Sequence, residues 1–306
     1  MIVSYGDALI DLYALPLGSD LEQSTSIAPH VGGSTCNVAI HARRLGAEVR
    51  FVGTLGDDGW GRRVRSALDS EGIDTSHLHT VSGLRTPVTF VRVHAAGERH
   101  FLSYRQASGP LSELVDSVSS SCLARAKWLH VSSSSLHSDA GAKATWRLLE
   151  WAQERGVRCS VDLNVRPGLW ADAATMRRAV ERLASFADLL KASEDDLAAL
   201  SIARDWDGLA ALTSPTGAAR AVLTRGAQGA VTRVANQWVD VPAPAVTMID
   251  ATGAGDAFVG ALLAQLAVAT DEDWDNVPWW RTALGCACES GAQAVTHIGA
   301  SLRHES

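Results

Sequence analysis

Along nearly the whole chain, short runs of β-branched or apolar residues alternate with longer segments whose apolar residues recur at helical spacing, and few folds accommodate that order. The short runs predict strands over residues 2–5, 49–53, 128–131, 158–162, 188–191 and 221–224. The longer segments predict helices over residues 37–45, 61–71, 142–155, 175–186 and 256–269. Parallel strands need such crossover helices, which cover both faces of the sheet. We therefore expect an α/β fold with a doubly wound, mostly parallel sheet flanked by helices.

One part of the chain departs from this alternation. Residues 86–94 and 99–105 each alternate apolar with polar side chains and flank a short connection that contains glycine, which predicts a β-hairpin. Together with the irregular stretch 12–30, the hairpin would form a small β-sheet that stands off the core as a lid. The expected organisation is an α/β core of residues 1–11, 31–80 and 108–306, with an inserted lid of residues 12–30 and 81–107.

The composition excludes several classes of partner. The chain has 27 lysine and arginine residues against 34 aspartate and glutamate residues, a formal net charge of −7, whereas nucleic-acid binding depends on clustered basic side chains. Its longest apolar run, residues 257–269, is shorter than the roughly 20 residues that cross a bilayer. Five scattered cysteines and the lack of a secretory pattern at the N-terminus indicate free thiols in a reducing compartment. We expect a cytoplasmic protein that binds neither nucleic acid nor membrane.

The strongest chemical signal is the segment Asp-Ala-Thr-Gly-Ala-Gly-Asp-Ala-Phe at residues 250–258, just before an apolar helix. Gly253, Ala254 and Gly255 leave the backbone nearly bare where the helix begins, and N–H groups at that position suit an anion. Asp256 follows in the first turn, is ionised at neutral pH and could accept a proton. An anion hole beside a carboxylate base suits phosphoryl transfer to an alcohol. The alternative is a glycine-rich turn in which Asp256 only stabilises the start of the helix.

A second signal is the segment Gly-Gly-Ser-Thr-Cys-Asn at residues 32–37. Gly32 and Gly33 let the backbone approach a ligand, and Ser34 or Thr35 could cap the helix that follows. Asn37 offers a donor and an acceptor from the first turn, as recognition of vicinal hydroxyl groups requires. A purely structural turn explains this segment equally well.

In this order and about 220 residues apart, the two glycine segments resemble the two signature regions of the ribokinase-like sugar kinases, the PfkB family. Further similar segments are residues 53–61, 224–229 and 294–300, so that the resemblance runs nearly end to end. Within the family, the fructokinases and 2-keto-3-deoxygluconate kinases are most similar at residues 6–11, 97–99 and 162–170.

The resemblance implies a ribokinase-like fold and an ATP-dependent kinase that transfers the γ-phosphoryl group to a hydroxyl of a small monosaccharide, with fructose favoured. The alternatives are a 2-keto-3-deoxygluconate kinase or another sugar or nucleoside kinase of the family. An alternative of another class is a non-catalytic sugar or nucleotide sensor, against which the intact segment 253–256 argues, since a pure binder needs no base.

The resemblance also implies roles for individual residues. Asp256 would be the general base, and Gly253, Ala254 and Gly255 would stabilise charge on the moving phosphoryl group. The residues implied to bind the sugar are Asp11, Gly32, Gly33, Asn37, Tyr104, Arg105, Arg166 and Asp256. Among them, Tyr104 and Arg105 would reach the substrate from the lid.

For the nucleotide, the resemblance implies binding by Lys191, Glu194, Thr224, Gly226, Gly229, Thr252, Gly253, Gly255 and Cys288. The family's Asn-x-x-Glu appears here as Lys191-Ala-Ser-Glu194, so that we expect Lys191 to meet the nucleotide phosphates. Glu194 would act on Mg²⁺ through water, and a monovalent cation such as K⁺ would lie beside Asp250 and Thr252. The expected cofactors are ATP, Mg²⁺ and K⁺, and the expected assembly is a homodimer formed through the lids.

Overall fold

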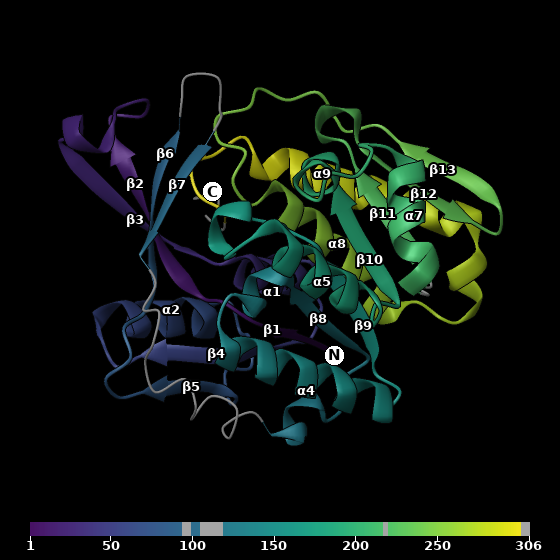
Figure 1. Cartoon of the computed structure of the whole chain (residues 1–306), viewed down its shortest axis with the longest axis horizontal. Coiled ribbons are helices and arrows are strands. Elements are labelled where there is room, and N and C mark those ends of the chain that lie inside the picture. Colours follow the sequence, from purple (N-terminus) through teal and green to yellow (C-terminus); the bar gives the residue numbers. More distant parts are fainter. Residues whose placement is uncertain (94–98, 105–118, 217–219, 301–306) are drawn as a thin grey trace.

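The computed structural model describes residues 1–93, 99–104, 119–216 and 220–300. Its larger sheet has nine strands in the order β13-β12-β11-β10-β9-β8-β1-β4-β5, of which the seven from β11 to β5 are parallel. The antiparallel strands β12 and β13 complete one edge (Figure 1). The strands are β1 (Ile2–Tyr5), β4 (Val49–Gly56), β5 (Leu78–Val81), β8 (Trp128–Ser132), β9 (Arg158–Asp162), β10 (Leu189–Ser193), β11 (Arg220–Thr224), β12 (Ala230–Val234) and β13 (Gln237–Val241). The predicted mostly parallel sheet is confirmed.

Helices cover both faces of this sheet. Successive strand residues point to opposite faces, and the residues on both faces are buried. Val222 contributes to one hydrophobic core and Leu223 to the other. The helices on the first side are α1 (Ser34–Arg44), α2 (Gly59–Ser70), α8 (Ala254–Val268) and α9 (Val277–Ala294). Those on the second side are α4 (Asp139–Glu154), α5 (Ala173–Ala184), the short α6 (Glu194–Ala199) and α7 (Trp206–Thr216). In the described part of the chain, no helix is both long enough and apolar enough to cross a membrane.

The second sheet has four strands, β3-β2-β6-β7, and stands at one end of the core (Figure 1). The predicted hairpin is confirmed as β6 (Val88–Val93) paired with β7 (Arg99–Tyr104). Residues 12–30 join the hairpin in this sheet as expected, because they belong largely to the antiparallel strands β2 (Leu9–Leu15) and β3 (Ser26–Gly32), and β2 pairs with β6. Pro29 is compatible with β3 because that strand lies at the edge of the sheet.

A cluster of arginine and tryptophan side chains forms at the amino-terminal end of β11, on the far side of the core from the carboxyl ends of the strands. The Arg220 guanidinium donates to the carbonyls of Arg233 (2.6 Å) and Trp274 (2.7 Å) and pairs with Asp275 at 3.0 Å. Its central carbon lies 5.2 Å from the ring centroids of both Trp274 and Trp280. A planar fork with five donors satisfies these partners together, which a lysine cannot do.

We therefore expect Arg220→Lys to lower the free energy of unfolding by about 2 kcal/mol, since it loses hydrogen bonds from a charged group and weakens two cation–π contacts. Chemical denaturation measures this loss. Arg177→Lys is the matched control, because Arg177 makes an exposed pair with Glu181 on α5 and its replacement should change the free energy by less than about 0.5 kcal/mol. Equal effects of the two substitutions would contradict the prediction.

Candidate active site

The predicted anion hole lies at the start of α8, where the Ala254 N–H already donates to the Ala251 carbonyl at 3.5 Å. Gly253 is the N-cap residue in a left-handed conformation (φ 79°, ψ 0°), and the first intrahelical bond runs from the Ala257 N–H to the Gly253 carbonyl. The N–H groups of Gly255 and Asp256 precede that bond, so they are available to a ligand. They also lie at the positive end of the helix dipole, which favours an anion.

The two glycine segments meet at the carboxylate of Asp256. The Ser34 hydroxyl donates to its Oδ1 at 2.7 Å, and the Asn37 Nδ2 donates to its Oδ2 at 2.8 Å. The expected capping role of Ser34 or Thr35 is wrong, because the N-cap of α1 is Gly33 and no side chain caps it. The Ser34 hydroxyl is committed to Asp256 instead. Asn37 Oδ1 is buried and has no hydrogen-bond partner within the described residues, as a group reserved for a ligand hydroxyl would be.

Asp11 lies at the junction between the small sheet and the start of α1. It is 6% exposed on β2, and its carboxylate occupies the space next to Gly32. A Cβ atom at position 32 would approach the Asp11 Cγ to 2.7 Å. Gly33 has φ 104°, and a Cβ there would approach the Asp7 carbonyl carbon to 2.9 Å. The two glycines therefore make room for atoms of the protein itself. The sequence interpretation assigned that room to a ligand.

Lys191 is buried on β10 and forms an ion pair with Asp162 of β9 at 3.0 Å. A second carboxylate, Asp196, lies 3.9 Å from the Lys191 Nζ. Burial alone would lower the pKa of Lys191, but the two carboxylates raise it. Burial also raises the pKa of Asp162 to about 6, so the pair is ionic at neutral pH. The Lys191 ammonium lies against α8, 3.2 Å from where a Cβ of Gly255 would be.

Three of the expected nucleotide-binding residues, Thr224, Gly226 and Gly229, belong to the turn between β11 and β12. Thr224 ends β11, and Gly226 and Gly229 have the positive φ values of 54° and 85° that this turn requires. Cys288 is buried on α9, with its Sγ 3.8 Å from the Val241 carbonyl. Glu194 is half-buried at the start of α6.

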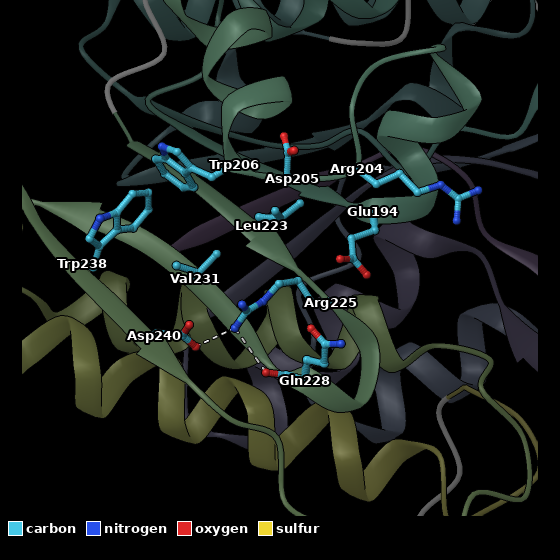
Figure 2. Close-up of a pocket in the computed structure, with 10 residues that line it drawn as sticks. All are labelled: Glu194, Arg204, Asp205, Trp206, Leu223, Arg225, Gln228, Val231, Trp238 and Asp240. Carbon is cyan, nitrogen blue, oxygen red and sulfur yellow. Dashed lines mark hydrogen bonds and ion pairs between the residues drawn. The ribbon is translucent and has the colours of Figure 1, made fainter.

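A cavity of about 390 Å³ adjoins this turn (Figure 2). Glu194, Arg225 and Gln228 line one end of it, and the edge-to-face pair Trp206 and Trp238 lines the other. The cavity contains neither Asp256 nor the 253–255 segment. It therefore extends beside the expected nucleotide site and does not coincide with the phosphoryl-transfer position.

The carboxylate of Asp250 is fully buried and accepts four hydrogen bonds. The Thr252 N–H and hydroxyl donate to its Oδ1 at 2.9 and 2.5 Å, and the Tyr13 hydroxyl and the Gly299 N–H donate to its Oδ2 at 2.9 and 3.0 Å. Tyr13 comes from β2, so this contact ties the small sheet to the segment that precedes the anion hole.

Two of the expected substrate residues, Tyr104 and Arg166, contact residues outside this cluster. Tyr104 ends β7, is 59% exposed and packs its ring against Phe90. Arg166 is exposed, and its Nη1 donates to the carbonyl of Val165 at 3.0 Å. Arg105 lies outside the described residues.

The sequence interpretation missed two residues of this site. Ser34 and Tyr13 contact residues more than 200 positions away, and no local pattern indicates such pairs. The sequence places Asp162 with Lys191 and Thr224 at the carboxyl ends of the strands, where a ligand is expected, but assigns it no role. In the parallel sheet, Asp162 and Lys191 are direct register partners.

His130 lies in the same buried polar layer and gives a pH-dependent prediction. Burial and then the Lys191 charge lower its pKa to about 3, and its Nδ1 lies 3.2 Å from the Ser160 Oγ. Between about pH 6.5 and 3 the unfolded chain binds a proton that the folded protein does not, so this histidine reduces stability as the pH falls. The raised pKa of Asp162 acts in the opposite sense, and it does so in wild type and variant alike.

As the pH falls from 6 to 4.5, the wild-type histidine lowers the free energy of unfolding. We expect His130→Gln to make this decrease smaller by about 1 kcal/mol per pH unit, which is below the limit of about 1.36 kcal/mol per pH unit for one proton. Urea denaturation at a series of pH values measures the slope. An unchanged slope would show that His130 is protonated in the folded protein.

Comparison with known proteins identifies the family of this chain. Residues 1–305 match the pfkB family of carbohydrate kinases. A fructokinase of Salmonella typhimurium is 33% identical over 300 residues, which cover 96% of this chain and 93% of the relative. Among solved structures, a double mutant of Vibrio cholerae fructokinase has fructose, ADP and a potassium ion bound. It has a TM-score of 0.86 and 31% identity to this chain, and the match covers 98% of this chain and 93% of the fructokinase chain. Aminoimidazole riboside kinase of Salmonella enterica, complexed with aminoimidazole riboside and an ATP analogue, has a TM-score of 0.82 and 29% identity over 98% and 95%. This chain belongs to the pfkB family of carbohydrate kinases, phosphotransferases that act on an alcohol acceptor.

Proposed function

We propose that this kinase transfers the γ-phosphoryl group of ATP to a hydroxyl of a small monosaccharide, with fructose as its preferred substrate. The observation that carries the proposal is the placement of Asp256 beside the start of α8, where Ser34 and Asn37 orient its carboxylate. The fructose and ADP bound by the Vibrio cholerae fructokinase support fructose as the acceptor.

In the proposed mechanism, Asp256 accepts the proton of the attacking hydroxyl as the phosphoryl group moves in line to the sugar oxygen. Phosphoryl transfer depends mainly on positioning and electrostatics. The free backbone N–H groups at the start of α8, those of Gly255 and Asp256, stabilise charge on the moving group, and Lys191 adds a positive charge beside them. Asn37 Oδ1 is available to accept a sugar hydroxyl, and Asp11 is placed to accept another.

ATP would lie between the start of α8 and the β11–β12 turn, over Thr224, Gly226, Gly229, Thr252 and Cys288. Glu194 fits a role in holding Mg²⁺ through water, because Mg²⁺ usually keeps several waters and takes one or two carboxylates together with substrate phosphates. When bound, Mg²⁺ neutralises charge on the nucleotide phosphates.

The side chain of Asp250 does not fit a monovalent cation. An ionised carboxylate has about four acceptor positions, and four donors already occupy those of Asp250. The Thr252 hydroxyl is likewise committed to that carboxylate. We therefore derive no step through K⁺ at these side chains.

We also propose that residues 12–30 and 81–107 form a lid on a core of residues 1–11, 31–80 and 108–306. Its strands extend slightly beyond these bounds, from Leu9 to Gly32. Tyr104 and Arg105 would reach the substrate from the lid once it closes, and Arg166 would reach it from the core. Several large apolar side chains are exposed on this sheet, and these favour a homodimer formed through the lids. The exposed side chains are Ile27, Phe101, Leu102 and Tyr104.

Turnover of ATP in the presence of fructose, 2-keto-3-deoxygluconate, ribose, aminoimidazole riboside and other nucleosides tests the proposal. We expect the highest kcat/KM with fructose. A higher value with the keto acid or with a riboside would reassign the substrate within the family. Sugar or nucleotide binding without turnover of any substrate would identify a non-catalytic sensor and overturn the proposal.

A further inference from the structure

We infer that Asp162 is a positioning residue of the kinase reaction, which holds the Lys191 ammonium at the anion hole. The inference rests on the proposed function and concerns a residue to which no role is otherwise given. Asp162 and Lys191 end up side by side because β9 and β10 are parallel neighbours in direct register. Both side chains are almost fully buried, and their charged atoms are 3.0 Å apart.

Among the carboxylates that the structure describes near Lys191, Asp162 is the one within hydrogen-bond distance of the ammonium. The other nearby carboxylate, Asp196, accepts hydrogen bonds from the Val165 N–H (2.7 Å), the Ser193 N–H (2.8 Å) and the Ser193 hydroxyl (2.7 Å). These bonds form the capping box that starts α6. Asp196 therefore has a structural task of its own, and it lies 3.9 Å from the lysine, beyond the distance of a good hydrogen bond.

The opposite side of the ammonium faces the start of α8. Its nitrogen lies 3.2 Å from where a Cβ of Gly255 would be, so the bare α-carbon of Gly255 is what admits it. A lysine ammonium has three donors, of which Asp162 takes one. The Asp256 carboxylate also contributes to the charge environment of Lys191. The pair thus brings a fixed positive charge under the anion hole, beside the base.

Stability alone does not account for a buried pair at this place. The cost of removing two charges from water offsets most of their attraction, so that apolar residues of similar volume often serve a core equally well. A charge that is desolvated and held in advance, in contrast, acts strongly on a phosphoryl group that arrives beside it.

A double-mutant cycle of Asp162→Asn and Lys191→Asn tests the inference. We expect each single substitution to lower kcat/KM for ATP by about 10- to 100-fold while KM for the sugar changes by less than about threefold. The kcat/KM of the double variant should be no more than about threefold below that of the less active single variant, because Asp162 acts through Lys191. Losses that multiply, or a loss below about threefold for Asp162→Asn, would overturn the inference.

Asp162→Asn leaves a buried lysine without its partner and could fail to fold. The comparison of Lys191→Asn with the double variant then remains, since both lack the lysine ammonium and differ only at residue 162. We expect equal kcat/KM values for the two, and a further tenfold loss in the double variant would overturn the inference. Asp74→Asn is the matched control, because it breaks the Arg50–Asp74 pair (2.7 Å) on β4 outside the site and should leave kcat/KM unchanged.

The same cycle measured on ADP binding by calorimetry separates this inference from the proposed function. We expect the losses of ADP affinity in the two single variants to fail to add in the double variant. Absence of turnover by the wild-type protein would refute the proposed function alone. Additive losses of ADP affinity would refute the role of Asp162 alone.

Discussion

Replacement of Asp256 by asparagine is expected to lower kcat at least about 100-fold while the Kd for ATP changes little. A general base contributes about 10²- to 10⁴-fold, or roughly 2.7 to 5.4 kcal/mol of the activation free energy. Asparagine has almost the same shape and can still contact Ser34 and Asn37, so the loss would report the missing proton acceptor. Steady-state kinetics with saturating sugar and calorimetric titration with ATP measure the two quantities.

Asp139→Asn is the control for this experiment. Asp139 also lies in the first turn of a long helix, α4, but it is exposed and remote from α8. If Asp256 merely stabilised the start of its helix, the two substitutions would have similar small effects on the free energy of unfolding and none on kcat. Retention of more than a tenth of the wild-type kcat by Asp256→Asn would refute its assignment as the base.

The fold could be predicted wherever one local pattern had one structural explanation. The apolar spacing of Met176, Val180 and Leu183 predicts α5, and these three side chains are buried on it. The antiparallel pair β12 and β13 was missed because its turn, Ala235 and Asn236, lacks the usual asparagine-glycine signal although both residues have positive φ. Tertiary packing of the neighbouring strand overrides the weak local preference there.

The site could be predicted where its chemistry is local to one segment. The predicted anion hole and Asp256 belong to one segment, and the structure places that segment at the start of α8 with Asp256 in its first turn. The groups that orient Asp256 were assigned other tasks, because Ser34 before a helix is also the pattern of a cap. Which task it performs depends on α8 being packed against α1, and that contact is not encoded in either segment alone.

Gly253 tolerates no side chain without strain, and Gly253→Ala is expected to lower kcat at least about 100-fold. Its φ of 79° costs an L-residue roughly 1 to 2 kcal/mol. A Cβ there would also approach the Cα of Ala300 to 2.8 Å, so that either the 299–300 turn or the start of α8 must move. Loss of one preorganised donor to a developing charge costs about 10²- to 10³-fold in rate.

Gly285→Ala separates this effect from a general cost of adding a methyl group. Gly285 lies within α9, where nothing is within 4 Å of an added Cβ, so alanine should raise the free energy of unfolding by up to about 1 kcal/mol and leave kcat unchanged. A Gly253→Ala variant with near wild-type kcat would mean that the start of α8 tolerates a shift, and the backbone N–H groups would then not be the source of charge stabilisation. A large loss of kcat with an intact unfolding transition would assign that source to the geometry that only glycine permits.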